Sequence, residues 1–205
     1  MAEPFEFVND QHKLVECYTA DIDAIEDPYF SVGFIIQPLD QGYFIFNSIN
    51  LTGSLESIQL RKVEDITLLK DNTAYLDAFT YYIDYNKQHQ LFDPYQLEAQ
   101  LNEQRFDTIF ALFNQLLQKK QIINILTYED QVFTGTIALL DQENIVLNLL
   151  DFEDYTLHTK QTIPFKHIQT IDLYHRENFL IKGYLASKSL EIPCNQSITC
   201  VLIAF

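Results

Sequence analysis

The sequence contains one ordered pattern of residues twice. The first copy holds Gly33 followed by the triplet Leu39-Asp40-Gln41, and the second holds Gly135 followed by Leu140-Asp141-Gln142. The glycines are 102 residues apart and the triplets 101. The first copy therefore has one more residue than the second between its glycine and its triplet. Each triplet precedes an apolar run that ends in Asn. Matches in the same order predict an internal duplication, which limits the fold to two similar units.

A second pair of matching segments lies downstream. Ile58, Leu60, Val63, Ile66 and Leu68 have the spacing of Ile163, Phe165, Ile168, Ile171 and Leu173. The matching residues are now 105 apart, which predicts four additional residues in the connection 151–162. Val63 is therefore expected to correspond to Ile168, and Ile58 to Ile163.

The second copy has the pattern of five short strands separated by turns. The expected strands are Gln121–Tyr128, Gln131–Leu140, Ile145–Leu150, Tyr155–Phe165 and Ile168–Tyr174. Strands this short suit a small, strongly bent barrel. Gly33 and Gly135 lie inside strand patterns, where glycine marks a bend or a close backbone approach. The first copy follows the same plan, with a first turn lengthened by Ala20–Pro28.

The segment between the copies has helical features. Asp93-Pro94-Tyr95-Gln96 is a helix-start signature, and apolar residues recur at helical spacing through Gln118. A break is expected near Arg105–Asp107. The residues from Tyr75 to Ile83 favour another helix, whereas Thr80–Tyr85 is equally compatible with a strand, so both alternatives stay open.

These patterns predict a mainly β protein with helices (α+β), built from two tandem five-stranded barrels joined by a helical segment. The expected boundaries are 1–75 for the first barrel with a short N-terminal segment, 76–118 for a helical connector, 119–180 for the second barrel and 181–205 for a C-terminal β extension.

The charge balance limits the partners. The chain has 29 acidic and 13 basic residues, a net charge of −16. A field of this sign opposes phosphate backbones and anionic membrane surfaces, so we expect no DNA and no membrane, and RNA is disfavoured. Residues 1–92 alone carry 15 acidic and 5 basic residues, which leaves the last third as the place for any anion-binding face.

The expected location is the cytoplasm. The N-terminus has no basic start followed by an apolar run, as a secretory signal would, and no segment approaches the length of a membrane span. Cys17, Cys194 and Cys200 form an odd set without a disulfide framework, which fits a reducing compartment.

The second copy resembles the Sm-like fold, and most closely the bacterial Sm-like RNA chaperone family, Hfq. The resemblance rests on Gly135-x-Ile137-x-x-Leu140-Asp141-x-x-x-Ile145-Val146-Leu147 and on Phe165-Lys166-His167-Ile168. It covers residues 93–174 and, more weakly, 3–70. It implies a short helix before a five-stranded bent barrel, assembly of barrels into rings through their edges, and RNA binding.

The chain departs from the family pattern in two places. Gln142-Glu143 stands where the family has an aromatic residue that stacks on a base, and a carboxylate there opposes RNA. In the first copy, Arg61-Lys62-Val63 stands in place of Lys166-His167-Ile168, so the Lys-His pair is not duplicated.

Lys166 and His167 are the only residues that the resemblance carries over from the family's nucleic-acid site. They would donate to phosphates or base edges, with His167 able to titrate near neutral pH. The alternative interpretation, which we favour, is a turn with two solvated polar side chains.

No other residues form a convincing site. His158, His167 and His175, with Asp154 or Asp172, lack the spacing of a zinc site. The acidic stretch Asp21–Asp27 lacks the glycine and the final carboxylate of a calcium loop. Cys194 and Cys200 are expected to be small apolar packing residues. The aromatic residues from Tyr75 to Tyr95 could stack on bases, although packing between barrel and helix fits their acidic surroundings better.

We therefore expect no cofactor and no catalytic residues, since the recognisable catalytic motifs are absent from the sequence. The predicted function is a non-catalytic protein-interaction or scaffold module that associates with itself through barrel edges as a dimer or trimer, or with a protein partner. The alternative is an RNA-binding Sm-like protein that acts through its C-terminal barrel. An enzyme with an unrecognised site is the third possibility.

Overall fold

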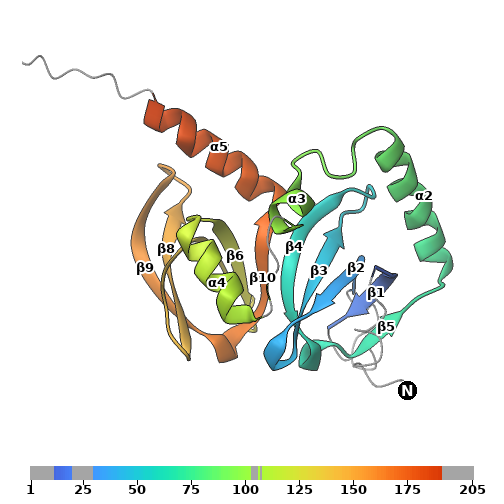
Figure 1. Ribbon diagram of the computed structural model, residues 1–205, viewed down its shortest axis with the longest axis horizontal. Coiled ribbons are helices and arrows are strands. Elements are labelled where there is room, and N and C mark those ends of the chain that lie inside the picture. The colour runs from blue at the N-terminus through green and yellow to red at the C-terminus, as the bar shows by residue number, and fades with distance from the viewer. Residues whose placement is uncertain (1–11, 20–29, 103–105, 107, 191–205) are drawn as a thin grey trace, which may run out of the picture.

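The protein is a mixed α+β structure built around one open antiparallel sheet (Figure 1). The computed structural model describes residues 12–19, 30–102, 106 and 108–190. Its ten strands are β1 Leu14–Tyr18, β2 Phe30–Pro38, β3 Tyr43–Ile49, β4 Leu55–Lys62, β5 Leu68–Lys70, β6 Ile122–Thr127, β7 Val132–Leu140, β8 Asn144–Asp151, β9 Thr156–Pro164 and β10 Ile168–His175. The five strands predicted for the second copy are thus confirmed to within two residues at each end.

Four α-helices lie in the described part of the chain. They are α2 Ala74–Gln88, α3 Leu97–Asn102, α4 Ile109–Gln118 and α5 Arg176–Leu190. Short 3-10 turns are η2 Asp40–Gly42, η3 Val63–Asp65 and η4 Phe165–His167. No helix among the described residues has the length and apolar character needed to cross a membrane.

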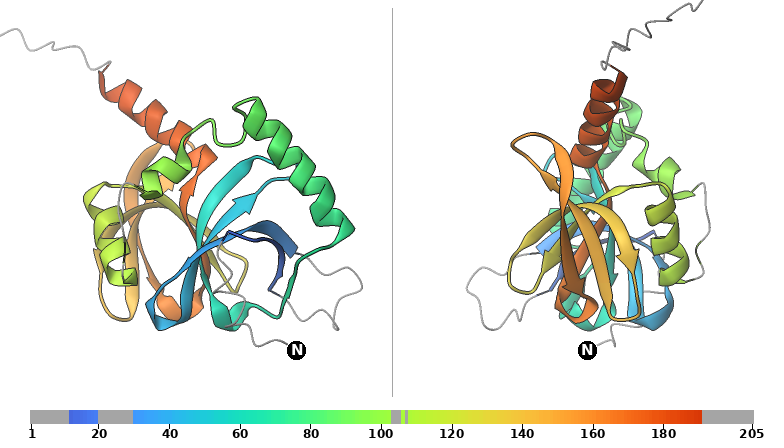
Figure 2. Two further views of the ribbon diagram at one scale, coloured as in Figure 1. Left: turned by 45° about the vertical axis from the view of Figure 1, so that its right-hand side comes forward. Right: turned by 90° about the vertical axis from the view of Figure 1, so that its left-hand side faces the viewer.

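The two halves of the sheet have the same strand order. The sheet runs β5-β1-β2-β3-β4-β10-β6-β7-β8-β9. Within each half the fifth strand pairs with the first, which is followed in space by the second, third and fourth. The halves join where β4 pairs with β10, and the strands of both halves curve strongly around this junction (Figure 2).

The strand pairing repeats down to its irregularities. Gly33 pairs with Ser48 in the first half, and Gly135 pairs with Leu149 in the second. The pairing of β2 with β3 shifts by one residue after Ile35, and that of β7 with β8 shifts after Ile137. Because the bulges lie at equivalent positions, β2 and β7 stay 102 residues apart throughout. The separation falls to 101 in the turn, where five residues lie between Pro38 and Phe44 but only four between Leu140 and Ile145.

The glycines allow a close approach of neighbouring strands. A Cβ atom added at Gly33 would lie 2.1 Å from the backbone oxygen of Asn47, and one added at Gly135 would lie 2.2 Å from that of Asn148. Any larger residue would push the third strand of the half away, so a close backbone approach is the reason for glycine at both positions.

The predicted separation of 105 residues in the downstream segments is wrong. Phe46 pairs with Gln59, and its counterpart Leu147 pairs with Gln161, which is 102 residues beyond Gln59. The structure therefore places one additional residue in the connection, not four. Alternating apolar residues match almost as well when slid along the strand, so sequence spacing alone selected a shifted register.

This correction changes which turn residues correspond. The turns η3 and η4 occupy the same place in their halves, so Val63 matches Phe165 and not Ile168. Lys166 and His167 match Glu64 and Asp65, and Arg61-Lys62 lies one step earlier, at the end of β4.

A helix follows the last strand of each half, so the two halves are alike beyond their strands. Helices α2 and α5 both have 15 residues, and they start 102 residues apart. The segment 76–118, predicted as a helical connector, contains most of α2 and all of α3 and α4. The open choice for Thr80–Tyr85 is settled as helix, capped by the Thr73 hydroxyl, which accepts from the Leu76 amide.

The predicted β extension at 181–205 is wrong for residues 181–190, which continue α5. Its apolar residues Ile181 and Leu185 recur four apart, as on a helix, and pack beside β6 and β8. Residues 191–205, including Cys194 and Cys200, lie outside the described part.

The segment between the halves contains α3 and α4. The predicted helix start at Asp93-Pro94 is wrong by four residues, because α3 begins at Leu97 and Gln96 has a positive φ of 55°. The Asp93 carboxylate still accepts from the amides of Leu97 and Glu98. Helices α3 and α4 are separate helices. The predicted break at Arg105–Asp107 lies between them and falls largely outside the described residues. Phe106, the one described residue of the three, is buried.

The main core is shared by both halves and by the connecting helices. It contains Ile45, Ile58 and Leu60 from the first half, and Ile123, Leu147 and Ile171 from the second. Helix α4 lies over one face of the second half (Figure 2), and its first amide, at Ile109, donates to the carboxylate of Asp40 in the first half, at 2.8 Å. The halves are therefore joined by backbone pairing, by the core and by a helix cap.

Candidate functional site

The two end strands of the sheet are candidate interaction edges. Among the described strands, β5 pairs with β1 alone and β9 pairs with β8 alone. The β9 edge is the longer, with nine residues against three, and its middle residues, His158, Thr159 and Lys160, are exposed. A strand at a sheet edge offers backbone donors and acceptors to another chain.

The backbone of β9 alternates between bonds to β8 and groups that face outward. The amide of Phe165, just after β9, donates to the carbonyl of Glu143 at 2.8 Å. In an antiparallel ladder every second residue has this orientation, so Ile163 and Gln161 bond to β8. Thr162 and Lys160 then direct their amides and carbonyls away from the sheet.

The junction between the halves is an example of a fourth strand paired with a fifth strand. Strand β4, the counterpart of β9, pairs with β10, the counterpart of β5. Leu60 lies opposite Ile171, and Gln59 lies opposite Asp172, to which its side-chain amide donates at 2.8 Å. The carboxylate of Asp172 also accepts from Asn124 on β6.

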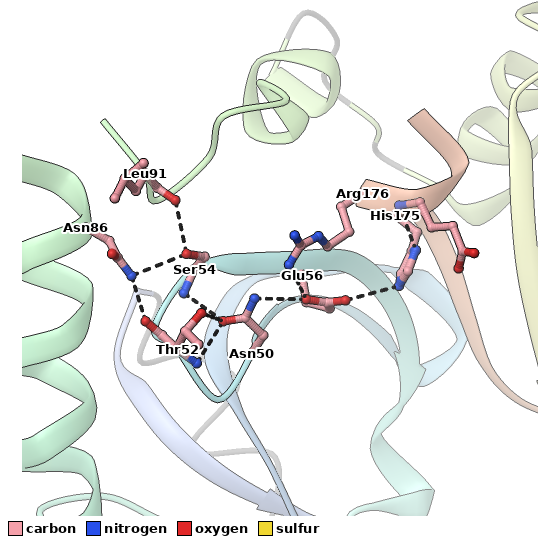
Figure 3. A network of polar contacts seen from close by, with 9 residues as sticks. Asn50, Thr52, Ser54, Glu56, Asn86, Leu91, His175 and Arg176 are labelled. Atoms are coloured by element: carbon pink, nitrogen blue, oxygen red, sulfur yellow. Dashed lines mark hydrogen bonds and ion pairs between the residues drawn. The ribbon is translucent and has the colours of Figure 1, made fainter. Parts of the chain in front are cut away.

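A polar network extends the junction to the helices (Figure 3). Glu56 on β4 accepts from the side-chain amide of Asn50 and pairs with Arg176 at 3.3 Å, at the start of α5. The imidazole of His175 lies 3.6 Å from the other carboxylate oxygen of Glu56. Because Glu56 belongs to the first half and Arg176 follows the last strand of the second, the network links the two halves.

Lys166 and His167 lie together on η4, at the turn before β10. The Nδ1 atom of His167 lies 2.9 Å from a carboxylate oxygen of Glu129, and this hydrogen bond lowers the pKa of Glu129. His167 is therefore paired with a carboxylate, while Lys166 is exposed to solvent.

Lys166 lines a groove that the sequence did not predict. The groove has a volume of about 610 Å³ and lies where turns of both halves meet. Its lining includes Tyr43 and Lys62 from the first half, and Phe165 from the second. These residues come from both copies, so no single motif could indicate them. A sequence signal for the groove would have been the correspondence of η3 with η4. The predicted separation of 105 residues hid this correspondence, because it matched Val63 with Ile168.

A hydrogen-bonded bridge crosses beside this groove. The ammonium group of Lys62 donates to the Tyr128 hydroxyl at 3.1 Å, and this hydroxyl donates to Asp65 at 2.8 Å. Partial burial raises the pKa of Asp65, and burial together with the Asp65 carboxylate raises the pKa of Tyr128. Lys62 is thus largely buried and paired, which removes it as a free cation for phosphate.

The remaining predicted candidates do not converge. Among the described residues, no three His, Cys, Asp or Glu side chains are placed to hold a metal ion. His158 lies on the exposed edge of β9, whereas His175 pairs with Glu56 at the junction. The acidic stretch Asp21–Asp27 falls outside the described residues. Cys17 is buried in the core of the first half, where burial raises the pKa of its thiol.

The aromatic residues of α2 divide into two groups. Phe79 is buried against the sheet, as expected for packing. Tyr75, Tyr81, Tyr82 and Tyr85 remain exposed. The first three form a chain of ring contacts with Phe79 and Phe30, whereas Tyr85 stacks on His89. The prediction that these aromatics pack between the sheet and the helix therefore holds for only part of the set.

Comparisons of the chain with models of known protein families, with curated protein sequences and with solved structures each find no match.

Proposed function

We propose that the chain is a duplicated pair of Sm-like five-stranded barrels that acts as a non-catalytic interaction module and associates with itself through its sheet edges. The strand order carries this proposal. Each half runs fifth, first, second, third, fourth, and the halves are joined fourth strand to fifth. Within the described residues, the sheet therefore ends in a fifth strand, β5, and a fourth strand, β9, each of which pairs on one side only.

The internal junction serves as the template for the joint between chains. Leu60 lies opposite Ile171 there, and the residues 102 positions away are Thr162 and Leu69. If a second chain placed its β5 beside this β9 in the same register, its Leu69 would lie opposite Thr162. Its Lys70 would lie opposite Gln161. Because the two edges differ, the contact is head-to-tail, which closes into a ring or continues as a filament.

Substitution of the outward-facing amide tests the proposal. Thr162→Pro removes the amide that faces a partner and leaves the bonds of its neighbours to β8 intact, whereas Thr162→Val keeps the amide and the branched shape. We expect wild-type and Thr162→Val chains to increase in mass with concentration in light scattering, and Thr162→Pro to associate at least about tenfold more weakly. A wild-type protein that stays monomeric at every concentration overturns the proposal.

A second candidate function is RNA binding by the C-terminal half. The groove that contains Tyr43, Phe165 and Lys166 favours it, because aromatic rings beside a cation suit a stacked base. The charges oppose it, since Glu64 lies in the same groove and Asp65 and Glu129 lie on adjoining turns. We therefore rank RNA binding below self-association.

A further inference from the structure

We infer that the pocket beside Arg61, where the two halves of the sheet join, binds a small phosphate compound that also carries an O–H group. The phosphate oxygens would pair with Arg61, and the O–H group would donate to Asp172. The inference is independent of self-association through the sheet edges. It rests on a buried cation with neutral partners, on the pocket that this cation lines, and on the residue at the equivalent position of the second half.

Arg61, on β4, is a buried cation whose hydrogen bonds go to neutral groups. The residue is 8% exposed. Its Nε and Nη2 atoms both donate to the side-chain oxygen of Gln59, the first at 2.8 Å, and Nη1 donates to the Ser31 hydroxyl at 2.7 Å. These bonds use three of the five N–H groups of a guanidinium. A buried charge ordinarily has a partner of opposite charge, and these partners supply none.

The thiol of Cys17 lies beside the guanidinium and does not supply a negative charge either. Arg61 lowers the pKa of this thiol, but burial raises the pKa by more, so the group titrates above its usual range. The thiol is therefore protonated at neutral pH.

The carboxylate of Asp172, on β10, reaches Arg61 only through Gln59. It accepts from the side-chain amide of Gln59 at 2.8 Å and from that of Asn124 at 3.2 Å. None of the ion pairs between described residues includes Arg61. The guanidinium is thus available to an anion from outside the chain, and the carboxylate, which has about four acceptor sites, has room for a further donor.

Arg61 and Asp172 line one pocket of about 360 Å³. Strands β4 and β10 lie side by side there (Figure 1), and the pocket also takes Ser31 from the first half and Thr170 from the second. The volume falls at the lower end of the range for small-molecule sites, about 300–1,000 Å³. The pocket therefore suits a phosphate group with at most a few further atoms, placed between a cation and an acceptor.

The second half shows that the fold does not require a cation at this position. Arg61 lies opposite Phe44 in the pairing of β3 with β4, and Ile163 lies opposite Ile145 in the pairing of β8 with β9. Arg61 and Ile163 are 102 residues apart, which is the separation that relates β4 to β9. Ile163 is 3% exposed and belongs to the main core. An apolar side chain thus satisfies the fold in the second half, so the buried arginine of the first half has a role beyond packing.

Nuclear magnetic resonance titrations of the full-length chain with inorganic phosphate and with glycerol phosphate test the inference. Sulfate is the control ion, because it has the shape of phosphate and no O–H group at neutral pH. Sodium chloride keeps the ionic strength constant. We expect saturable shifts of the Arg61 Nε–H signal and of the Ser31 and Thr170 amides with a millimolar Kd, and at least fivefold weaker binding of sulfate. Tighter binding of glycerol phosphate than of phosphate would assign the site to a monoester, and the reverse to the free ion.

Two variants separate this pocket from general attraction to cations. Arg61→Gln removes the charge and keeps a hydrogen-bonding side chain, so we expect binding at least tenfold weaker. Arg176→Gln is the matched control, because it removes the same charge from an arginine that is already paired with Glu56. It should bind phosphate as the wild type does.

Three results overturn the inference: no saturable shift with either phosphate compound, equal binding by Arg61→Gln and the wild type, or sulfate binding as tight as phosphate binding. The wild-type titration alone remains decisive if Arg61→Gln does not fold, because its shifts identify the residues at the bound ion. Shifts confined to exposed lysine residues would place the ion elsewhere and overturn the inference as well.

Discussion

The side-chain amide of Asn86 donates a hydrogen bond of 2.7 Å to the backbone carbonyl of Thr52. It ties the last turn of α2 to the loop between β3 and β4. Lys188 and Asp154 lie 102 residues further along the chain, and the Lys188 ammonium group donates to the Asp154 carbonyl in the same way. The two halves thus share a helix-to-loop contact made by different side chains.

Asn86→Ala tests the importance of this contact in the first half. Asn86 is 7% exposed and also donates to the Ser54 hydroxyl, so the change removes two hydrogen bonds made by a buried side chain. We expect a loss of about 1–3 kcal/mol in the free energy of unfolding, measured by urea denaturation. The control is Lys188→Ala in the second half, whose exposed contact predicts a loss below about 1 kcal/mol. Equal effects of the two changes would contradict this account.

Gly135→Ala tests the close approach of β7 and β8. The added methyl group would overlap the backbone of Asn148, which cannot rotate away as a side chain could. We expect a loss of about 2–4 kcal/mol in thermal or urea unfolding. Gly183→Ala is the matched control, because nothing lies within 4 Å of its added Cβ and the position is inside α5. That change should stabilise the protein by up to about 1 kcal/mol.

Glu98→Gln tests the pH dependence of stability. Burial raises the pKa of Glu98, and the nearby Asp93 carboxylate raises it further, while Lys87 and the amide of Asn47 partly oppose this. A carboxyl group with a raised pKa binds its proton more tightly in the folded state, so its contribution to stability increases as the pH falls through that pKa.

Glutamine keeps the acceptor for Asn47 and removes the charge. Glu98→Gln should therefore be more stable than the wild type at neutral pH. The difference should shrink to near zero below the ordinary glutamate pKa of about 4.3. Urea unfolding at a series of pH values measures this difference, and one that grows towards acid pH would show that the sign is wrong.

Tyr128→Phe tests the bridge between the halves. The change removes the hydroxyl that links Lys62 to Asp65 and keeps the ring beneath the Lys62 ammonium group, 5.0 Å from the ring centroid. We expect a loss of about 1 kcal/mol in the free energy of unfolding, because a partly exposed hydrogen bond to a charged group is lost. Val132→Ala, at an exposed position on β7, is a control that should change stability by less than about 0.5 kcal/mol.

An anisotropy titration with A-rich and U-rich single-stranded RNA tests the second candidate function. Few cations are available to neutralise phosphates, and His167 is already paired with Glu129. We therefore expect no measurable binding at physiological salt. Micromolar binding that is lost in Lys166→Ala/His167→Ala would favour the RNA-binding alternative over self-association.

The strands of the second half could be predicted from the sequence because their turns carry strong local signals. Asp141 illustrates this: its carboxylate accepts from the amides of Glu143 and Asn144, which closes the turn between β7 and β8 without distant contacts. The contact of the Asp93 carboxylate with the Leu97 amide, at the start of α3, is local in the same sense. Local chemistry of this kind is visible in a short window of sequence.

Features that depend on distant pairing could not be predicted. The register of β9 on β8 depends on a bulge after Asn148, and the apolar spacing around Ile163 fits more than one register. Helix α2 carries aromatic residues nearly all around, so its periodicity does not separate helix from strand. The groove beside Lys166 arises where η3 and η4 of different halves meet, which no local pattern encodes.

Cysteine pairing between chains tests the head-to-tail joint most directly. Gln59 and Asp172 meet across the internal junction, and their counterparts on the open edges are Gln161 and Lys70. Gln161 and Lys70 lie on β9 and β5, the opposite ends of the ten-stranded sheet, so they cannot meet within one chain.

The measurement is the mass of the Lys70→Cys/Gln161→Cys chain after mild oxidation, on a non-reducing gel, with each single variant as a control. The account predicts covalent species of two or more chains for the double variant, which revert on reduction, and no more than wild-type background for either single variant. A double variant that remains a single chain at concentrations where the wild type associates, or a single variant that forms the same covalent species, would contradict the proposed joint.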